Sequence, residues 1–121
     1  MRPGSVRIAK ITVEAHDEGP VVRVAGEIDL SNSDDLRNDI VHAVPHDAHG
    51  VVLDLTETTY LDSSGIRLLF ELAERLQARR QRLVLVVAEE ALVRRVVVLT
   101  KLDDAVPLLQ GIDEALLALR G

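Results

Sequence analysis

The chain has 121 residues and a net charge of −6. The length suits one domain, and an acidic surface repels phosphate backbones and anionic lipid, so we expect no direct nucleic-acid partner and no membrane insertion. Cysteine is absent and aromatic residues make up 2%, which excludes disulfides, thiolate metal sites and an aromatic platform for single-stranded nucleic acid. The N-terminus lacks the apolar run of a signal peptide, so we expect a cytoplasmic protein.

The first part of the chain predicts a β-hairpin. Residues 6–15 and 21–30 are rich in β-branched side chains, as is typical of strands. Residues 16–20, with the sequence HDEGP, supply the turn between them.

Residues 31–44 place apolar side chains at helical spacing, which predicts a helix. Ser31 or Ser33 is the expected N-cap, because a serine side chain accepts a hydrogen bond from a free backbone N–H at a helix start. Pro45 ends the helix, since proline disfavours the helical conformation of the residue before it.

The middle of the chain predicts a strand, a helix and a second strand. Residues 50–55 and 82–88 are short, continuous apolar runs, as expected of strands covered on both faces. A helix begins near Ser63 between them, and this order implies parallel pairing of the two strands. The buried stripe of that helix is expected to consist of Ile66, Leu68, Leu69, Phe70, Leu72, Ala73 and Leu76.

Three shorter elements complete the predicted fold. Residues 89–102 suit either a strand or a helix, and we predict a helix because no turn signal precedes the segment. Residues 105–109 predict a short strand, and residues 113–120 a last helix capped by Asp113. The order of elements indicates an α/β fold: a mixed sheet of four or five strands with about four helices packed on it.

Asp62, Ser63, Ser64 and Gly65 stand where the predicted helix begins, a place where functional sites gather in α/β sheets. A purely structural cap is one interpretation. A serine hydrolase is a weaker one, because the nucleophile-elbow pattern fails and all four histidines precede the serine. A phosphate-accepting serine is another, because a hydroxyl at a helix start is accessible and the helix dipole favours added negative charge.

A histidine metal site is the remaining alternative. His46 and His49 are three residues apart with Asp47 between them, but no third ligand cluster lies nearby in the sequence. We therefore expect no metal and no cofactor.

Three segments together resemble the STAS-domain proteins, specifically the single-domain anti-sigma factor antagonists. These segments are GEIDLSNSDDLRNDI, VVLDLTETTYLDSSGIRLLFELAERL and LVLVVAEEALVRRVVVLTKLDDAVPL. The resemblance covers roughly residues 8–119 and implies one STAS domain over residues 1–121. It implies a bacterial, non-enzymatic partner-switching regulator of transcription. Such a protein binds an anti-sigma factor that is also a serine kinase, and thereby frees a sigma factor.

The resemblance also implies roles for individual residues. The kinase uses ATP to phosphorylate the serine after the motif aspartate, which is Ser63 here, with Ser64 as the second choice; a PP2C-type phosphatase reverses the reaction. Asp29 matches an acidic residue close to that serine. The partner-binding residues would be Asp29, Asp62, Ser64, Gly65, Ile66 and Arg67.

Two features depart from the family pattern. Lys101 stands where a glycine is usual after the third helix, and Arg80 and Gln81 replace a usual glycine pair. Proteins with STAS domains also serve as scaffold subunits of stress-signalling complexes and as cytosolic subunits of lipid or anion transporters, which is the alternative function. We expect a monomer or a weak dimer.

Overall fold

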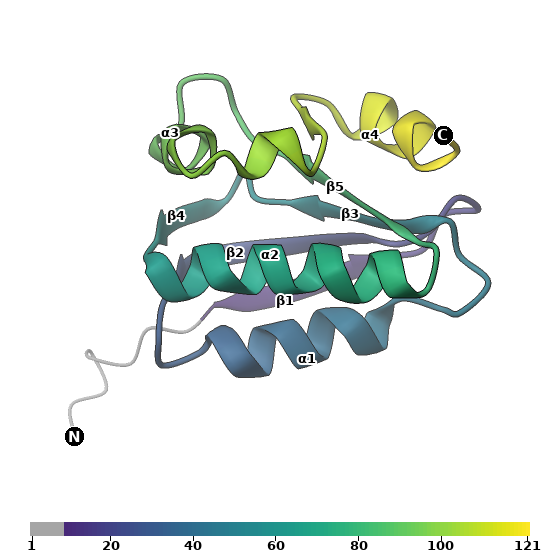
Figure 1. Cartoon of the computed structure of the whole chain (residues 1–121), viewed down its shortest axis with the longest axis horizontal. Helices are drawn as coiled ribbons and strands as arrows, with labels where there is room; N and C mark the ends of the chain where they lie inside the picture. The colour runs from purple at the N-terminus through teal and green to yellow at the C-terminus, as the bar shows by residue number, and fades with distance from the viewer. Residues whose placement is uncertain (1–8) are drawn as a thin grey trace.

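A mixed sheet of six strands runs through the molecule and carries helices on its faces (Figure 1). The computed structural model describes residues 9–121, so residues 6–8 of the expected first strand lie outside the described part. The strands are β1 (Lys10–Glu14), β2 (Val21–Ile28), β3 (Gly50–Asp54), β4 (Thr58–Leu61), β5 (Arg82–Val86) and β6 (Leu108–Leu109). The helices are α1 (Ser33–Ala43), α2 (Ser63–Ala78), α3 (Leu92–Leu99) and α4 (Ile112–Leu119), with a 3-10 turn η2 (Leu102–Asp104).

The strand order β1-β2-β3-β5-β6 confirms the α/β fold and the mixed sheet. β1 and β2 form the predicted antiparallel hairpin. β3 pairs in parallel with β2 and with β5, and β6 adds in parallel to β5. The segment with two interpretations, residues 89–102, forms α3 and η2, as predicted.

One strand of the sheet, β4, was not expected from the sequence. β2 has eight residues and extends beyond the end of β3. Its first half pairs with β3, and the residues Gly26–Ile28 of its second half pair with β4. The Thr58 hydroxyl donates a hydrogen bond of 2.7 Å to the carbonyl oxygen of Val24 and so fixes β4 to β2. β4 is four residues long with two exposed polar or aromatic side chains at its centre, and such a segment carries little apolar periodicity.

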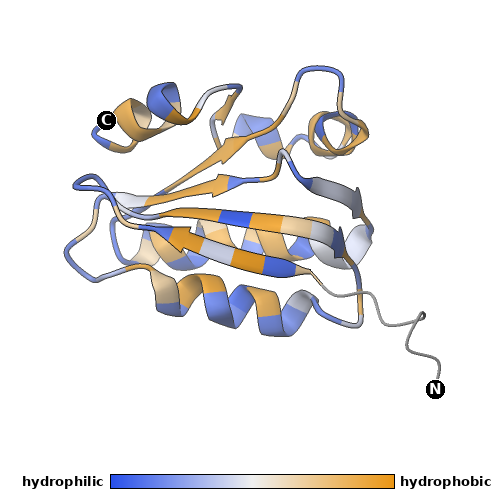
Figure 2. Ribbon diagram, turned by 180° about the vertical axis from the view of Figure 1, so that it is seen from behind, coloured by the Kyte–Doolittle hydropathy of each residue, from blue (hydrophilic) through white to orange (hydrophobic). Residues whose placement is uncertain are grey.

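The core occupies both faces of the sheet. α1 and α2 lie together on one side of the sheet, α4 lies on the other, and α3 lies beside β4 (Figure 1). Figure 2 shows the central strands as nearly continuous apolar ribbons, as expected where both faces are covered. No helix in the described part of the chain is both long and apolar enough to cross a lipid bilayer.

Helix α2 buries most of the predicted stripe, but Phe70 is an exception. Its side chain is 36% exposed, whereas Leu68, Leu69, Leu72 and Leu76 are fully covered. Successive helical residues are about 100° apart, so Phe70 is rotated away from the face that Leu69 and Leu76 share. The prediction of a buried Phe70 was therefore wrong.

Two predicted helix caps are also wrong. The N-cap of α1 is Asn32, without a capping hydrogen bond from its side chain, while Ser33 is buried inside the first turn. The N-cap of α4 is Gly111, and Asp113 lies within the first turn. An acidic first-turn residue still interacts favourably with the helix dipole, which explains Asp113 at that position.

Candidate functional site

The residues of interest meet where β2 and β4 end and α2 begins. Ile28 and Leu61, the last residues of the two strands, are partners in the parallel ladder. The backbone N–H of Asp62 continues this pairing with a hydrogen bond of 3.2 Å to the carbonyl oxygen of Ile28. The start of α2 and the loop after β2 are therefore held side by side.

The carboxylate of Asp62 joins these two segments. One oxygen accepts hydrogen bonds from the backbone N–H groups of Ser64 (2.8 Å) and Gly65 (3.0 Å), so Asp62 is the N-cap of α2. The other oxygen accepts a hydrogen bond of 3.3 Å from the backbone N–H of Leu30. One side chain thus satisfies free donors of the helix and fixes the loop that follows β2.

Asp29 organises that loop. Its carboxylate accepts hydrogen bonds from the backbone N–H and the hydroxyl of Ser31. The Asn32 side chain accepts a hydrogen bond from the Asp29 backbone N–H and donates one of 2.8 Å to the carbonyl oxygen of Glu27. The side chain of Asn32 therefore forms its hydrogen bonds within the loop and does not cap α1.

Ser63 is exposed at the first position of α2, a helix of 16 residues. No hydrogen bond joins its hydroxyl to any residue between 9 and 121. Ser64, the second choice, is half-buried. Of the two hydroxyls, that of Ser63 is the more accessible to an enzyme arriving from solvent.

The rest of the predicted set divides into buried and exposed residues. Arg67 is exposed, whereas Gly65 and Ile66 are buried. A Cβ atom at Gly65 would come within 2.5 Å of Leu61 Cδ1 and 3.2 Å of Ile28 Cγ2. Gly65 therefore allows α2 to approach the ends of β4 and β2 closely, and its contribution to the site is positional.

Sequence reasoning did not assign Leu30 or Tyr60 to the site, although both side chains are exposed. Leu30, which was placed inside the second predicted strand, is 79% exposed in the loop that Asp62 holds. Tyr60, on β4, is 48% exposed. No sequence signal marked Leu30, because residues 21–30 read as one strand, whereas β2 ends at Ile28.

The four histidines lie away from Ser63. His16 precedes β2 and His49 precedes β3, so both lie at the end of the sheet where these strands begin. His42 and His46 lie at the end of α1 and in the loop that leads back to β3. Ser63 follows the opposite end of the sheet, so the described residues offer it no histidine base. The described part of the chain also holds no group of three or more potential metal ligands.

Comparison with known proteins identifies the family of the chain. Residues 11–111 match the family model described as "Mlab, STAS domain". The chain belongs to the STAS domain family. A curated relative, the anti-sigma-F factor antagonist RsfB of Mycobacterium tuberculosis, is 30% identical over 111 residues, which are 92% of this chain and 89% of the relative.

Solved STAS structures extend the comparison. A crystal structure of an anti-sigma factor antagonist from Mycobacterium paratuberculosis has a TM-score of 0.82 and 33% identity, and the match covers 94% of this chain and 96% of that one. The anti-sigma factor antagonist SpoIIAA in its unphosphorylated form has a TM-score of 0.73 and 23% identity, covering 93% and 97%. At that identity the second comparison shows the STAS fold alone.

Proposed function

We propose that this STAS domain is an anti-sigma factor antagonist that is switched by phosphorylation of Ser63. Unphosphorylated, it binds an anti-sigma factor that is also a serine kinase, and a sigma factor is released. Phosphorylation of Ser63 by that kinase ends the binding, and a PP2C-type phosphatase restores it. The observation that carries the proposal is the exposed Ser63 hydroxyl directly after the capping Asp62, in a chain that is 30% identical to a named antagonist.

Local electrostatics support a switch that leaves the fold intact. A phosphate on Ser63 adds a charge of about −1.5 to −2 at the N-terminus of α2, where the helix dipole favours an anion by roughly 0.3–1 kcal/mol. The carboxylate of Asp62, the residue before Ser63, repels the phosphate. At an exposed position this repulsion is similar in size to the favourable effect of the helix dipole. These effects nearly cancel, so the free energy of unfolding changes little.

Partner binding responds differently to the same phosphate. A docked surface would remove water from Ser63, and desolvation of a dianion without a matching cation costs far more than the local effects on folding. Leu30 is exposed beside the capping Asp62, so an apolar partner surface that covers it also approaches Ser63. The phosphate thereby opposes docking without unfolding the domain.

The test uses the purified chain and the anti-sigma factor kinase recovered with it from the source cell. With ATP, intact-mass spectrometry is expected to show one phosphate on the wild type and none on Ser63→Ala. Ser63→Asp is expected to weaken binding to the anti-sigma factor at least about tenfold, which corresponds to roughly 1.4 kcal/mol. Calorimetric titration without ATP measures that affinity.

Ser64→Ala is the matched control, because it removes the neighbouring hydroxyl and leaves Ser63 in place. It is expected to accept one phosphate on Ser63, as the wild type does. Phosphate on Ser64 or elsewhere in Ser63→Ala would contradict the assignment of the acceptor. Unchanged affinity in Ser63→Asp would contradict the switch.

The cellular location and the oligomeric state follow from this function. We place the antagonist in the cytoplasm, where the kinase and ATP are found, and propose that it acts as a monomer or weak dimer by binding and not by catalysis. The absence of a histidine near Ser63 among the described residues is consistent with a serine that accepts phosphate from another enzyme.

A further inference from the structure

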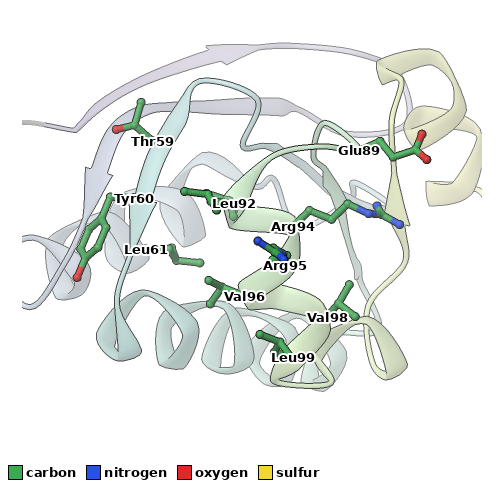
Figure 3. A pocket seen from close by; sticks show the side chains of 11 residues that line it. Thr59, Tyr60, Leu61, Glu89, Leu92, Arg94, Arg95, Val96, Val98 and Leu99 are labelled. Carbon is green, nitrogen blue, oxygen red and sulfur yellow. The ribbon is translucent and has the colours of Figure 1, made fainter.

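An open groove of about 640 Å³ lies between β4 and α3 (Figure 3). Eight large apolar side chains are exposed among residues 9–121, and four of them line this groove: Tyr60, Leu92, Val98 and Leu99. Leu92 is 69% exposed and Leu99 is 79% exposed. Such a concentration of apolar surface in one hollow marks an interaction site, whereas scattered single residues do not.

Two arginines add positive charge to the same groove. Arg94 and Arg95 line it, and neither forms an ion pair within the described part of the chain. The Nη1 atom of Arg94 is buried without a hydrogen-bond partner. Glu89, the acidic residue of the lining, accepts a hydrogen bond from Gln110. Two arginines beside this apolar hollow are thus without an ion pair among the described residues, on a chain whose net charge is −6.

We infer that the groove binds an acidic amphipathic helix of a partner protein. Figure 3 shows Leu61, Leu92 and Val96 close together between strand and helix, and Arg95 beside them. Apolar side chains on one face of the incoming helix would cover this surface, as in other complexes that seat a helix in a groove. Carboxylates at the edge of that face would pair with Arg94 and Arg95. α3 has eight residues, about 12 Å, which suits an occupant of two to three turns.

Other occupants fit the observations less well. A second copy placed symmetrically over α3 would bring the same arginines of both copies toward one another, which is unfavourable. An anionic membrane would meet a concave surface on a chain whose net charge is −6. An acidic helix satisfies the shape, the apolar lining and the unpaired arginines together.

The inference does not depend on phosphorylation of Ser63. The groove contributes Thr59, Tyr60 and Leu61 from β4 and otherwise consists of α3 and the turn before it. Binding to it is measurable on the unphosphorylated chain without a kinase. Failure of the Ser63 experiment and failure of the groove experiment are therefore separate results.

The test selects peptides from a displayed library of random 12-residue sequences on the immobilised full chain. The expected sequences combine Leu, Ile or Phe at helical spacing with Asp or Glu. Synthetic copies of them are then titrated by fluorescence polarisation. Leu99→Ser and Arg95→Glu are each expected to weaken binding about tenfold or more, because they remove an apolar contact and reverse a complementary charge.

Leu117→Ser on α4 and Arg75→Glu on α2 are the matched controls, since both side chains are exposed and lie outside the groove. They are expected to change affinity less than about twofold, and circular dichroism checks that every variant is folded. The inference is overturned by any of four results: no enrichment above bare support, enrichment of peptides without acidic residues, binding insensitive to Leu99→Ser and Arg95→Glu, or groove-dependent binding of phosphatidylglycerol vesicles or of a second copy in place of peptide.

Discussion

Asp54 is a buried carboxylate, 2% exposed, at the end of β3. Its two oxygens accept hydrogen bonds from the backbone N–H and hydroxyl of Thr56 and from Nε of Arg23, the last at 2.8 Å. Burial raises the pKa of Asp54, but the hydrogen bonds from Thr56 and Arg23 outweigh it and hold the pKa below its ordinary value. The ionised form is therefore favoured by folding, and it ties β3 to its partner strand β2.

We predict that this contribution depends on pH. Because the pKa of Asp54 is lower in the folded chain, the stabilisation is fully present above the unfolded pKa of about 3.9 and is lost as pH falls through the folded value. Asp54→Asn is expected to lower the free energy of unfolding by roughly 2 kcal/mol at pH 7, since a charged hydrogen-bond acceptor is lost. Urea denaturation between pH 7 and pH 3 should show the gap between variant and wild type narrowing below about pH 4.

Asp47→Asn serves as the control, because Asp47 is exposed in the loop between α1 and β3. It is expected to follow the wild type closely at neutral pH. A gap for Asp54→Asn that stays constant over the whole pH range would show that the loss reflects packing and not the charge of the carboxylate.

The sequence could assign Asp62 and Ser63 to the candidate site, because they are covalent neighbours at the start of a strongly periodic helix. It could not place Leu30 there, because the contact between Leu30 and Asp62 joins residues 32 positions apart. The prediction of the N-cap of α1 was wrong for a related reason. Three polar residues in a row compete at that loop, and the hydrogen bonds of Asp29 with Ser31 and Asn32 decide which residue begins the helix.

At the level of elements, the ends of α2 and α3 explain two departures from the family pattern. Arg80 has φ of 60° and Lys101 has φ of 62°, the left-handed conformation that glycine adopts most readily. After α2, the N–H of Arg80 bonds the Gln77 carbonyl and the N–H of Gln81 bonds the Leu76 carbonyl, which is the Schellman arrangement. The backbone keeps the conformation of a glycine terminus although the side chains are large.

Gln81 compensates for part of this replacement. Its side chain is buried, and its amide nitrogen donates hydrogen bonds to the carbonyl oxygens of Pro45 (2.8 Å) and Ala48 (3.0 Å). A glycine at this position could not make these contacts. Gln81 therefore fixes the loop between α1 and β3 to the end of α2.

We predict that glycine at the two left-handed positions stabilises the fold. Arg80→Gly and Lys101→Gly each remove the clash between Cβ and the following carbonyl group, which costs roughly 1–2 kcal/mol per residue. The gain is reduced by the greater entropy of glycine in the unfolded chain, so each variant is expected to gain up to about 1 kcal/mol in the free energy of unfolding. Urea denaturation of each variant and of the double variant measures the change.

Arg79→Gly provides the matched control for this experiment. Arg79 is the neighbouring C-cap residue with φ of −96°, where a side chain causes no such clash. It is expected to lose stability, because glycine there only adds freedom to the unfolded chain. Equal effects at positions 79 and 80 would contradict the explanation from backbone conformation.

The elements differ in how well the sequence predicts them. The apolar runs of β3 and β5 and the periodicity of α2 are intrinsic to the residues, so the sequence predicts them. β4 depends on tertiary structure, because it exists through pairing with the free half of β2 and through the hydrogen bond from Thr58 to Val24. The prediction that Phe70 is buried was wrong, because the sequence shows which residues of α2 are apolar but not how much of the helix surface the rest of the fold covers.

At the level of the whole molecule, alternating residues of the same strands supply both faces of the core. Val51 and Leu53 pack with α1 and α2, whereas Val52, between them, packs with Ala115 and Leu116 of α4. The sheet is therefore shared by both halves of the core, and neither half keeps its structure if the strands separate. This coupling is the physical reason to expect one domain over the described residues.

We predict that the chain unfolds in a single cooperative transition. Trp is absent, so Phe70→Trp on α2 and Leu117→Trp on α4 introduce one fluorescent probe on each side of the sheet, both at exposed positions. Because β3 and β5 contribute to both halves of the core, both probes and far-UV circular dichroism should give the same urea midpoint. The free energy of unfolding should fall by about 1–3 kcal/mol per molar of urea. An earlier midpoint at position 117 would show that α4 separates before the sheet unfolds. Circular dichroism of each variant against the wild type separates that outcome from a local effect of the tryptophan.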